Sequence, residues 1–223
     1  MLYYASKRFF ADVLVTGYID AASDGRFVVY VSNMAGAANA PSLEGARVVV
    51  SAWSWASGLV SNWTVDVPAI LPHSSGRVCT VPLSDVMRGC ASPADCVLTL
   101  DLMGPPPERA QLAHNWAYIA PLRNVTSMRD PGLRVVRVAA ADAQARGGYA
   151  AFTVTLTAQA LPAAVVWLET VLPGRFSDNG FLLTQLSVDV QWVSAQPGVT
   201  PAQLAASLIV QSLWDAAPYD AGL

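Results

Sequence analysis

Residues 96–102 read CVLTLDL, and this stretch decides the fold class. In an extended chain, alternate side chains point to opposite sides. The stretch would therefore place one apolar set on one side and a mixed set on the other: Cys96, Leu98, Leu100 and Leu102 against Val97, Thr99 and Asp101. Such alternation is typical of a half-buried strand in an antiparallel sheet.

The same period of two recurs on both sides of this stretch. Upstream, residues 47–55 place Val48, Val50 and Ala52 on one face and Val49, Ser51, Trp53 and Trp55 on the other. Downstream, residues 152–157 and 186–192 alternate in the same way, and shorter apolar runs cover 27–31, 116–119, 133–138, 165–168 and 208–213. Strands at this spacing, separated by Gly, Pro, Asn and Asp, predict antiparallel β-sandwiches. Alternating strand and helix units are absent, which argues against a barrel enzyme or a nucleotide-binding fold.

Helical signals are few. Residues 82–87 predict one or two turns capped by Ser84, and Thr200 with Pro201 predicts a capped turn that reaches Ala206. Residues 1–10 form an amphipathic segment which, as a helix, would place Leu2, Phe9 and Phe10 roughly on one side.

The chain has room for two domains. Its 223 residues are 53% hydrophobic, and one immunoglobulin-like sandwich takes roughly 100 residues. Residues 104–107, GPPP, are a strong breaker, and residues 129–132, RDPG, predict a turn. We therefore expect an all-β chain of two consecutive immunoglobulin-like sandwiches, at 12–127 and 128–223, preceded by a short segment at 1–11.

Composition excludes several partners. The net charge of -3 and the absence of a basic stripe argue against nucleic acid. No stretch approaches the roughly 20 apolar residues of a membrane span. Residues 1–10 contain two aromatic pairs around Lys7 and Arg8, without the apolar run and cleavage site of a signal peptide.

The residues that carry chemistry are scattered. Hydrolysis of a glycoside usually needs two carboxylates flanking the bond, and no pair stands out among Asp85, Asp95, Asp101, Asp178 and Asp189. His73 and His114 lie far apart in the sequence, and no phosphate-binding loop or nucleophile elbow occurs. The sequence therefore predicts no catalytic residue, no metal site and no cofactor.

Trp53 and Trp55 support two interpretations. On one face of a strand they would form a platform for a sugar ring, or they would fill a core or a domain interface. The structural interpretation is favoured because it also explains Val49 on the same face.

Residues 173–181, PGRFSDNGF, are the most distinctive stretch. Asp178 and Asn179 can hydrogen-bond nearby backbone, and Gly180 tolerates a positive φ, so the stretch predicts a tight turn. The functional alternative makes Asp178 an active-site or sugar-binding acid. The turn interpretation is better supported, and it gives a structural role to the whole signature: Arg175, Phe176, Ser177, Asp178, Asn179, Gly180 and Phe181.

This stretch resembles the signature of the last immunoglobulin-like domain of β-mannosidases of glycoside hydrolase family 2, of the animal lysosomal type. The preceding VVWLE at 165–169, the closing LIVQSL at 208–213 and the opening MLYYASKRFFA at 1–11 are also similar to that family. Between them AWSW at 52–55 and the cysteine pattern at 79–97 agree, so the resemblance covers essentially the whole chain.

The resemblance implies a role. The family's enzymes remove terminal β-linked mannose with two glutamates of a (β/α)₈ barrel, and no residue here matches either glutamate. Residues 1–11 would then be the end of a barrel helix, and the chain would brace a catalytic barrel without being an enzyme alone. The alternative is a free-standing carbohydrate-binding or protein-interaction module, with weak glycan contact. An exposed row containing Trp53 and Trp55 would favour binding, and buried indoles would favour bracing.

The resemblance also implies a lysosomal or secretory location. In an oxidising compartment we expect Cys90 and Cys96 to form a disulfide across a small loop that contains Pro93, with Cys79 as a buried thiol. Two sequons, at Asn62 and Asn124, are glycosylation candidates. Asn62 is expected in a loop and is the better candidate, whereas Asn124 is expected near the domain junction, where it is shielded.

Overall fold

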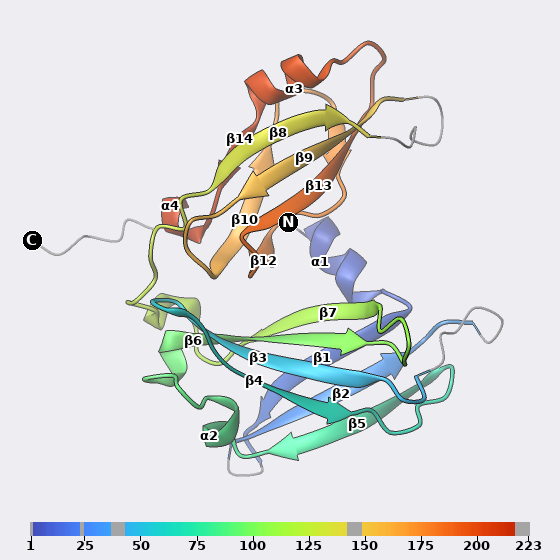
Figure 1. Ribbon diagram of the computed structural model, residues 1–223, viewed down its shortest axis with the longest axis vertical. Helices are drawn as coiled ribbons and strands as arrows, with labels where there is room; N and C mark the ends of the chain where they lie inside the picture. Colours follow the sequence, from blue (N-terminus) through green and yellow to red (C-terminus); the bar gives the residue numbers. More distant parts are fainter. Residues whose placement is uncertain (1, 23–24, 37–42, 142–148, 217–223) are drawn as a thin grey trace, which may run out of the picture. The chain divides into compact units, whose positions relative to one another are not determined.

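The computed structural model describes residues 2–22, 25–36, 43–141 and 149–216, and it divides the chain into two compact units. The N-terminal unit is Ser6–Met128. The C-terminal unit is Arg129–Leu223 together with Met1–Ala5. Helix α1 (Leu2–Phe9) is therefore shared between the units (Figure 1).

The N-terminal unit is a sandwich of two antiparallel sheets (Figure 1). Strands β1 (Val13–Asp20), β2 (Arg26–Asn33) and β5 (Ser74–Val81) form one sheet in the order β1-β2-β5. The other has the order β4-β3-β6-β7, with β3 (Arg47–Ser54), β4 (Gly58–Asp66), β6 (Cys96–Met103) and β7 (Gln111–Tyr118). Helix α2 (Leu83–Val86) and two 3₁₀ turns, η1 (Pro93–Asp95) and η2 (Leu122–Asn124), lie in the connections.

The C-terminal unit is a second sandwich of the same kind. One sheet has the order β11-β13-β9-β8, with β8 (Arg134–Ala140), β9 (Ala151–Thr157), β11 (Gly174–Phe176) and β13 (Ser187–Ser194). The other has the order β12-β10-β14, with β10 (Ala163–Glu169), β12 (Phe181–Leu183) and β14 (Ile209–Gln211). Helices α3 (Pro201–Ser207) and α4 (Leu213–Ala216) flank β14. The expected all-β, antiparallel fold class is thus confirmed.

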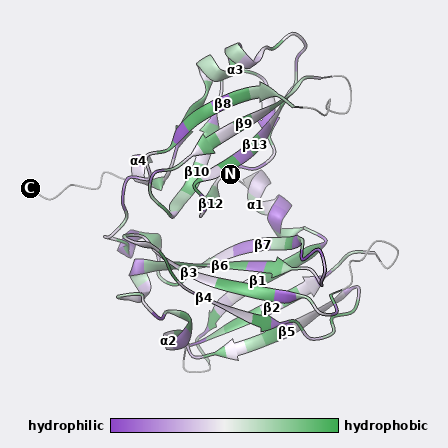
Figure 2. Cartoon of the chain, viewed as in Figure 1, coloured by the Kyte–Doolittle hydropathy of each residue, from purple (hydrophilic) through white to green (hydrophobic). Residues whose placement is uncertain are grey.

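The core of the N-terminal unit is aliphatic, and Figure 2 shows the hydrophobic residues concentrated along its strands. Leu98, Leu100 and Leu102 of β6 are fully buried, as expected. Val97 and Thr99 on the other face are buried as well, so the half-buried assignment of β6 is wrong, and only Asp101 and Met103 of this strand are partly exposed. The reason is that β6 is a central strand whose second face is covered by neighbours such as Trp53, whose indole N–H donates to Thr99 Oγ1 at 3.2 Å.

The core of the C-terminal unit is more aromatic. Phe152 and Trp192 are buried on the neighbouring strands β9 and β13, with ring centroids 5.8 Å apart. Gly174 lies directly over the Trp192 indole, and a Cβ at this position would approach the ring to 2.3 Å. The glycine is therefore required by packing, because any side chain would collide with the indole.

The short helices agree with the sequence only in part. Thr200 caps α3, and its hydroxyl accepts from the Gln203 N–H while the Gln203 side chain accepts from the Thr200 N–H. Ser84 does not cap α2, because that helix begins one residue earlier, after Pro82. The final strand is also shorter than 208–213, since the chain turns into α4 at Leu213.

Candidate functional site

The signature turn is anchored by a buried amide. The Asn179 side chain is 2% exposed. Its Oδ1 accepts from the Leu168 N–H and its Nδ2 donates to the Leu168 carbonyl, both at 2.8 Å. Asn179 thus pairs with β10 as the backbone of a neighbouring strand would. Its Oδ1 also accepts from the nearby Gly180 N–H at 3.2 Å, as expected for a turn.

The rest of the signature supports this anchor. Asp178 Oδ1 accepts from the Asn179 N–H at 2.8 Å, and Gly180, at a φ of +66°, donates to the Val166 carbonyl at 2.8 Å. Ser177 exchanges hydrogen bonds with the Gln191 backbone, which ties the turn to β13. Phe176 and Phe181 are buried on either side of the turn, whereas Arg175 is exposed. The stretch therefore has the geometry of a structural turn.

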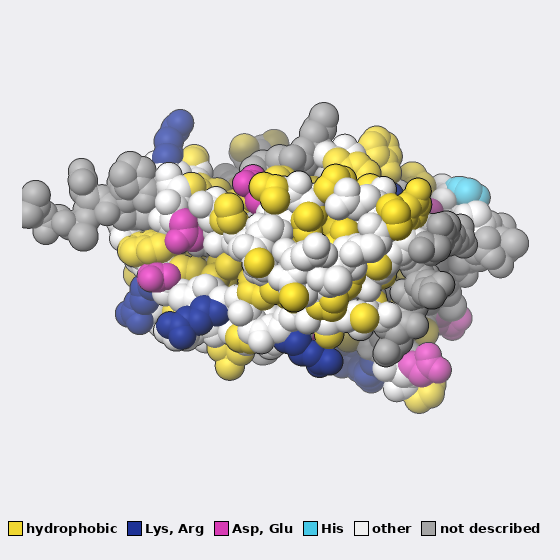
Figure 3. Space-filling model, turned by 90° about the horizontal axis from the view of Figure 1, so that it is seen from above, with side chains coloured by type: hydrophobic (Ala, Val, Ile, Leu, Met, Phe, Trp, Pro, Cys, Tyr) yellow, Lys and Arg dark blue, Asp and Glu magenta, His cyan; other side chains and the backbone are white. Residues whose placement is uncertain are grey.

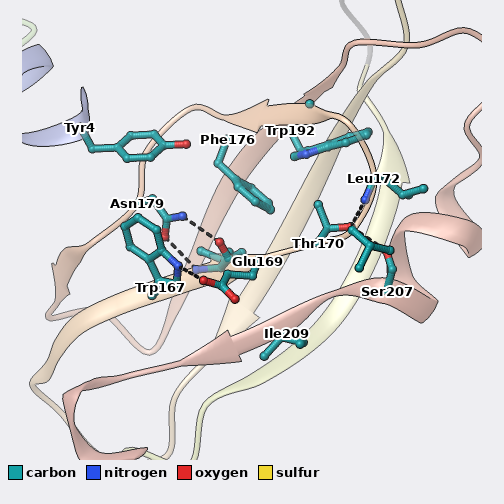
Figure 4. A pocket seen from close by; sticks show the side chains of 13 residues that line it. Tyr4, Trp167, Glu169, Thr170, Leu172, Phe176, Asn179, Trp192, Ser207 and Ile209 are labelled. Atoms are coloured by element: carbon teal, nitrogen blue, oxygen red, sulfur yellow. Dashed lines mark hydrogen bonds between the residues drawn. The ribbon is translucent and has the colours of Figure 1, made fainter. Parts of the chain in front are cut away.

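This turn borders a cavity of about 390 Å³ in the C-terminal unit (Figure 4). Tyr4 and Trp167 stand at right angles, with ring centroids 6.1 Å apart and an interplanar angle of 88°. The Trp167 indole N–H donates to Glu169 Oε1 at 2.8 Å. The described lining is completed by residues of β10, β11, β13, β14, the end of α3, the connection before β11 and the turn after it: Leu168, Thr170, Val171, Leu172, Gly174, Phe176, Asn179, Trp192, Ser207 and Ile209.

Polar groups of the cavity form a short hydrogen-bonded chain. The Leu172 N–H donates to Thr170 Oγ1 at 3.2 Å, Thr170 and Ser207 share a bond of 2.6 Å, and the Ser207 hydroxyl donates to the Leu204 carbonyl at 3.2 Å. Because the Ser207 proton is used there, Thr170 donates to Ser207. Both hydroxyl oxygens keep acceptor capacity toward a ligand.

Tyr4 is a cavity-lining residue whose pKa is shifted by its surroundings. Burial raises the pKa of the Tyr4 phenol, and a hydrogen bond with the backbone of Phe176 acts in the opposite direction. The phenol is therefore neutral over the physiological range and offers the cavity an uncharged ring.

The tryptophans singled out from the sequence are not an exposed platform. β3 ends at Ser54, so Trp55 lies beyond the strand and is 2% exposed. Trp53 is half-buried and hydrogen-bonded to Thr99. The two indoles serve the packing of the N-terminal unit, which supports the bracing interpretation over glycan contact at this position.

The histidines are not brought together either. His114 Nδ1 lies 2.7 Å from Asp101 Oδ1, across the β6–β7 ladder, and Gln111 donates to the same oxygen. His73 occupies a turn with a φ of +56°. Within the described ranges, no three His, Cys, Asp or Glu side chains come close enough together to hold a metal ion.

Cysteines and sequons fall in the N-terminal unit. Cys90 and Cys96 are joined by a disulfide with a Cα–Cα distance of 6.0 Å, and Cys79 is a free, half-buried thiol whose pKa is raised by burial.

Asn62 lies in the edge strand β4, so the expected loop position is wrong, although its side chain is exposed. Asn124, in η2, has an exposed side chain as well, and its expected shielding at the domain junction stays a prediction. Glycosylation of both remains a prediction.

Surface charge is sparse. On the face seen in Figure 3, apolar and uncharged polar side chains are interleaved, and acidic and basic groups are few and scattered. None of the described helices has the length and apolar character to cross a bilayer.

Sequence reasoning missed the cavity. It noted residues 165–169 as an apolar run and as a stretch resembling a family, and Tyr4 only as part of an amphipathic terminal segment. One signal was present: Trp167 and Glu169 are two residues apart, so in a strand they share a face. The contribution of Tyr4 had no local signal, because it depends on folding of a distant segment.

Two antiparallel sandwiches with three- and four-stranded sheets place the chain in the class of tandem immunoglobulin-like domains. Solved structures agree. An exo-chitosanase from Amycolatopsis orientalis superposes with a TM-score of 0.63 at 14% identity, over 94% of this chain and 26% of that chain. At this identity the likeness shows the fold alone.

Sequence comparisons then give the relatives. Residues 128–216 match Ig_mannosidase, an Ig-fold domain. The chain is 28% identical over 219 residues to the β-mannosidases of Capra hircus and Bos taurus, and 24% identical over 225 residues to that of Rattus norvegicus. The chain is thus similar to β-mannosidases, and its residues 128–216 match a domain with the immunoglobulin fold. The matches cover 96% of this chain and 23% of each relative's length.

Proposed function

We propose that this chain is a non-catalytic region of a β-mannosidase-type glycoside hydrolase and braces a catalytic barrel. The observation that carries the proposal is the extent of the similarity, which takes in 96% of this chain but only 23% of each relative. A complete enzyme of this type would hydrolyse terminal, non-reducing β-D-mannose residues in glycans. Its location would be lysosomal or secretory, where Asn62 and Asn124 would meet the glycosylation machinery.

The bracing surface would include the exposed aromatic side chains of α1 and the residue after it. Tyr3, Phe9 and Phe10 are 57%, 67% and 86% exposed. Burying a large apolar side chain contributes roughly 1.5–3 kcal/mol, so these rings favour a covering partner. We propose the barrel as that partner.

The activity of the chain alone tests the non-catalytic part of this proposal. The purified chain should release no p-nitrophenol from p-nitrophenyl β-D-mannoside. This expectation rests on the sequence, in which no carboxylate pair stands out. Hydrolysis that follows the polypeptide through repurification would refute the proposal.

Sequencing of the transcript upstream of the Met1 codon tests the bracing role. A continuous frame that encodes a barrel with two catalytic glutamates supports it. In that longer enzyme, the double variant Phe9→Ser/Phe10→Ser should lower the melting temperature of the barrel. An in-frame stop codon just upstream would instead make the chain a free-standing module and refute bracing within one polypeptide.

The isolated chain offers a second check. If a partner normally covers Phe9 and Phe10, the isolated chain should self-associate at high concentration. The double variant Phe9→Ser/Phe10→Ser should then be monomeric, with an unchanged melting temperature. These point changes are sharper than removal of residues 1–10, because that deletion also removes Tyr4 from Trp167 and Arg8 from its position over the Trp116 ring.

A further inference from the structure

We propose that the cavity beside Trp167 binds one hexopyranose ring of a neutral glycan. This proposed site is independent of the bracing role, and it lies on a different surface from Trp53 and Trp55. The cavity volume of about 390 Å³ lies in the range of small-ligand sites, and its lining combines aromatic rings with a few convergent polar groups.

The orientation of the carboxylate carries the argument. An indole N–H lies in the plane of its ring, so Glu169, which accepts from the Trp167 N–H, lies beyond the ring edge and not over its face. A flat ligand stacked on the face of the Trp167 indole would therefore have the Glu169 carboxylate beside its outer edge. A pyranose has this form, with C–H groups on its faces and equatorial hydroxyls around its rim.

The other walls suit the same ligand. Tyr4 stands perpendicular to Trp167, so the two rings form a corner that holds a flat, rigid body (Figure 4). Thr170 and Ser207 add acceptor oxygens, since their protons are already donated within the protein. The site therefore offers two aromatic surfaces and several acceptors to a ligand rich in hydroxyl donors.

Two other ligand classes fit less well. Of the described residues that line the cavity, one, Glu169, is acidic and none is Lys, Arg or His, so the lining supplies no cation to hold a phosphate or a carboxylate. A quaternary ammonium ion is held by several ring faces at once. Here Trp192 is fully buried and Phe176 is 7% exposed, so Tyr4 and Trp167 are the two rings available.

Titration of the full chain with simple glycosides tests the proposal. The probes are methyl β-D-mannopyranoside and methyl β-D-glucopyranoside, added up to about 100 mM because contacts with one ring give millimolar affinity. Indole N–H resonances observed by NMR report the site directly. We expect the Trp167 resonance to shift and saturate. Sorbitol, which has the hydroxyls without the ring, should leave it unmoved.

Variants assign the binding to the cavity. Trp167→Ala should weaken binding by about tenfold or more, and the isosteric change Glu169→Gln by several-fold, because an amide oxygen is a weaker acceptor than a carboxylate. Trp63→Ala and Asp189→Asn, matched changes of partly or fully exposed residues outside the cavity, should leave affinity unchanged. Glu169→Gln keeps the test valid if Trp167→Ala fails to fold.

Several results would overturn the proposal. These are no saturable shift with either glycoside, equal affinity in the wild type and Glu169→Gln, equal binding of sorbitol, or tighter binding of tetramethylammonium than of the glycosides. Failure of the proposed bracing role would not count against the glycan site, because that site is built within the C-terminal unit alone.

Discussion

The two sandwiches share an architecture but are held together differently. The N-terminal unit is built on a continuous aliphatic cluster in which Leu98, Leu100 and Leu102 are fully buried. The C-terminal unit has in addition a buried amide, Asn179, whose oxygen and nitrogen both pair with the backbone of Leu168, whereas the Oδ1 of the buried Asn33 in the N-terminal unit has no hydrogen-bond partner. Apolar alternation tolerates many sequences, whereas a buried amide requires one geometry. The difference explains why the distinctive signature of the chain lies in the second unit.

Leu100→Ala should have the largest effect and should act on the N-terminal unit. Loss of a fully buried leucine costs about 3 kcal/mol from transfer and cavity terms. Urea unfolding, with resonances of each unit followed by NMR, measures the change. Leu59→Ala, at a 48% exposed position of β4, is the matched control and should cost about 0.5 kcal/mol or less. Equal effects of the two changes would contradict the aliphatic-core description.

Asn179→Ala should destabilise the C-terminal unit by about 2–3 kcal/mol, because it leaves the N–H and C=O of Leu168 without their partners. The same unfolding experiment applies, and the resonances of the N-terminal unit should keep their midpoint. Asn124→Ala, at an exposed position, is the control. A loss shared equally by both units would show that the comparison between them is wrong.

The double change Cys90→Ser/Cys96→Ser should cost about 2.4 kcal/mol on the chain-entropy estimate for a loop of seven residues. It should act on the N-terminal unit alone. Peptide mapping by mass spectrometry provides the control, since the untreated chain should yield a Cys90–Cys96 pair. A bond from Cys79 to either partner would overturn this assignment.

The smallest expected effect concerns pH. Burial raises the pKa of the Cys79 thiol, and a backbone hydrogen bond from Val29 opposes that shift. The folded state thus holds the proton more tightly than the unfolded state. The resulting stability is complete below the unfolded pKa and is lost as pH rises through the folded pKa. In Cys79→Ala, the free energy of unfolding should therefore fall less between pH 8 and pH 10, near the thiol's ordinary pKa of about 8.5. Identical slopes in both proteins would refute it.

The sequence predicted the strands well because alternation is a local property. It placed the strand at 186–192, the cap at Thr200 and the positive φ of Gly180 correctly. The prediction failed where the environment of a residue is set by segments distant in the sequence. The second face of β6 is buried by adjacent strands, and Asn62 lies in a strand whose polar residues resemble a loop. Neither outcome is encoded in the local pattern.

The cavity shows the same limit more sharply. Trp167 and Glu169 lie on one face of β10 and were within reach of a pattern argument. Tyr4 enters from the other end of the chain, and Ser207 from the end of α3. Sites assembled from several distant segments need the fold before they can be recognised.

The irregularity in β10 has a consequence for how the chain can change over evolutionary time. The pairing of β10 with β12 shifts register between Ala163 and Val166, and Val165 there has a φ of +51°. This extra residue sets the phase that turns Val166 and Leu168 inward and Trp167 and Glu169 outward. Insertion or deletion of a single codon in this short stretch would exchange the two sets. Homologous sequences should therefore vary here by substitution and keep their length, whereas length variation should accumulate elsewhere.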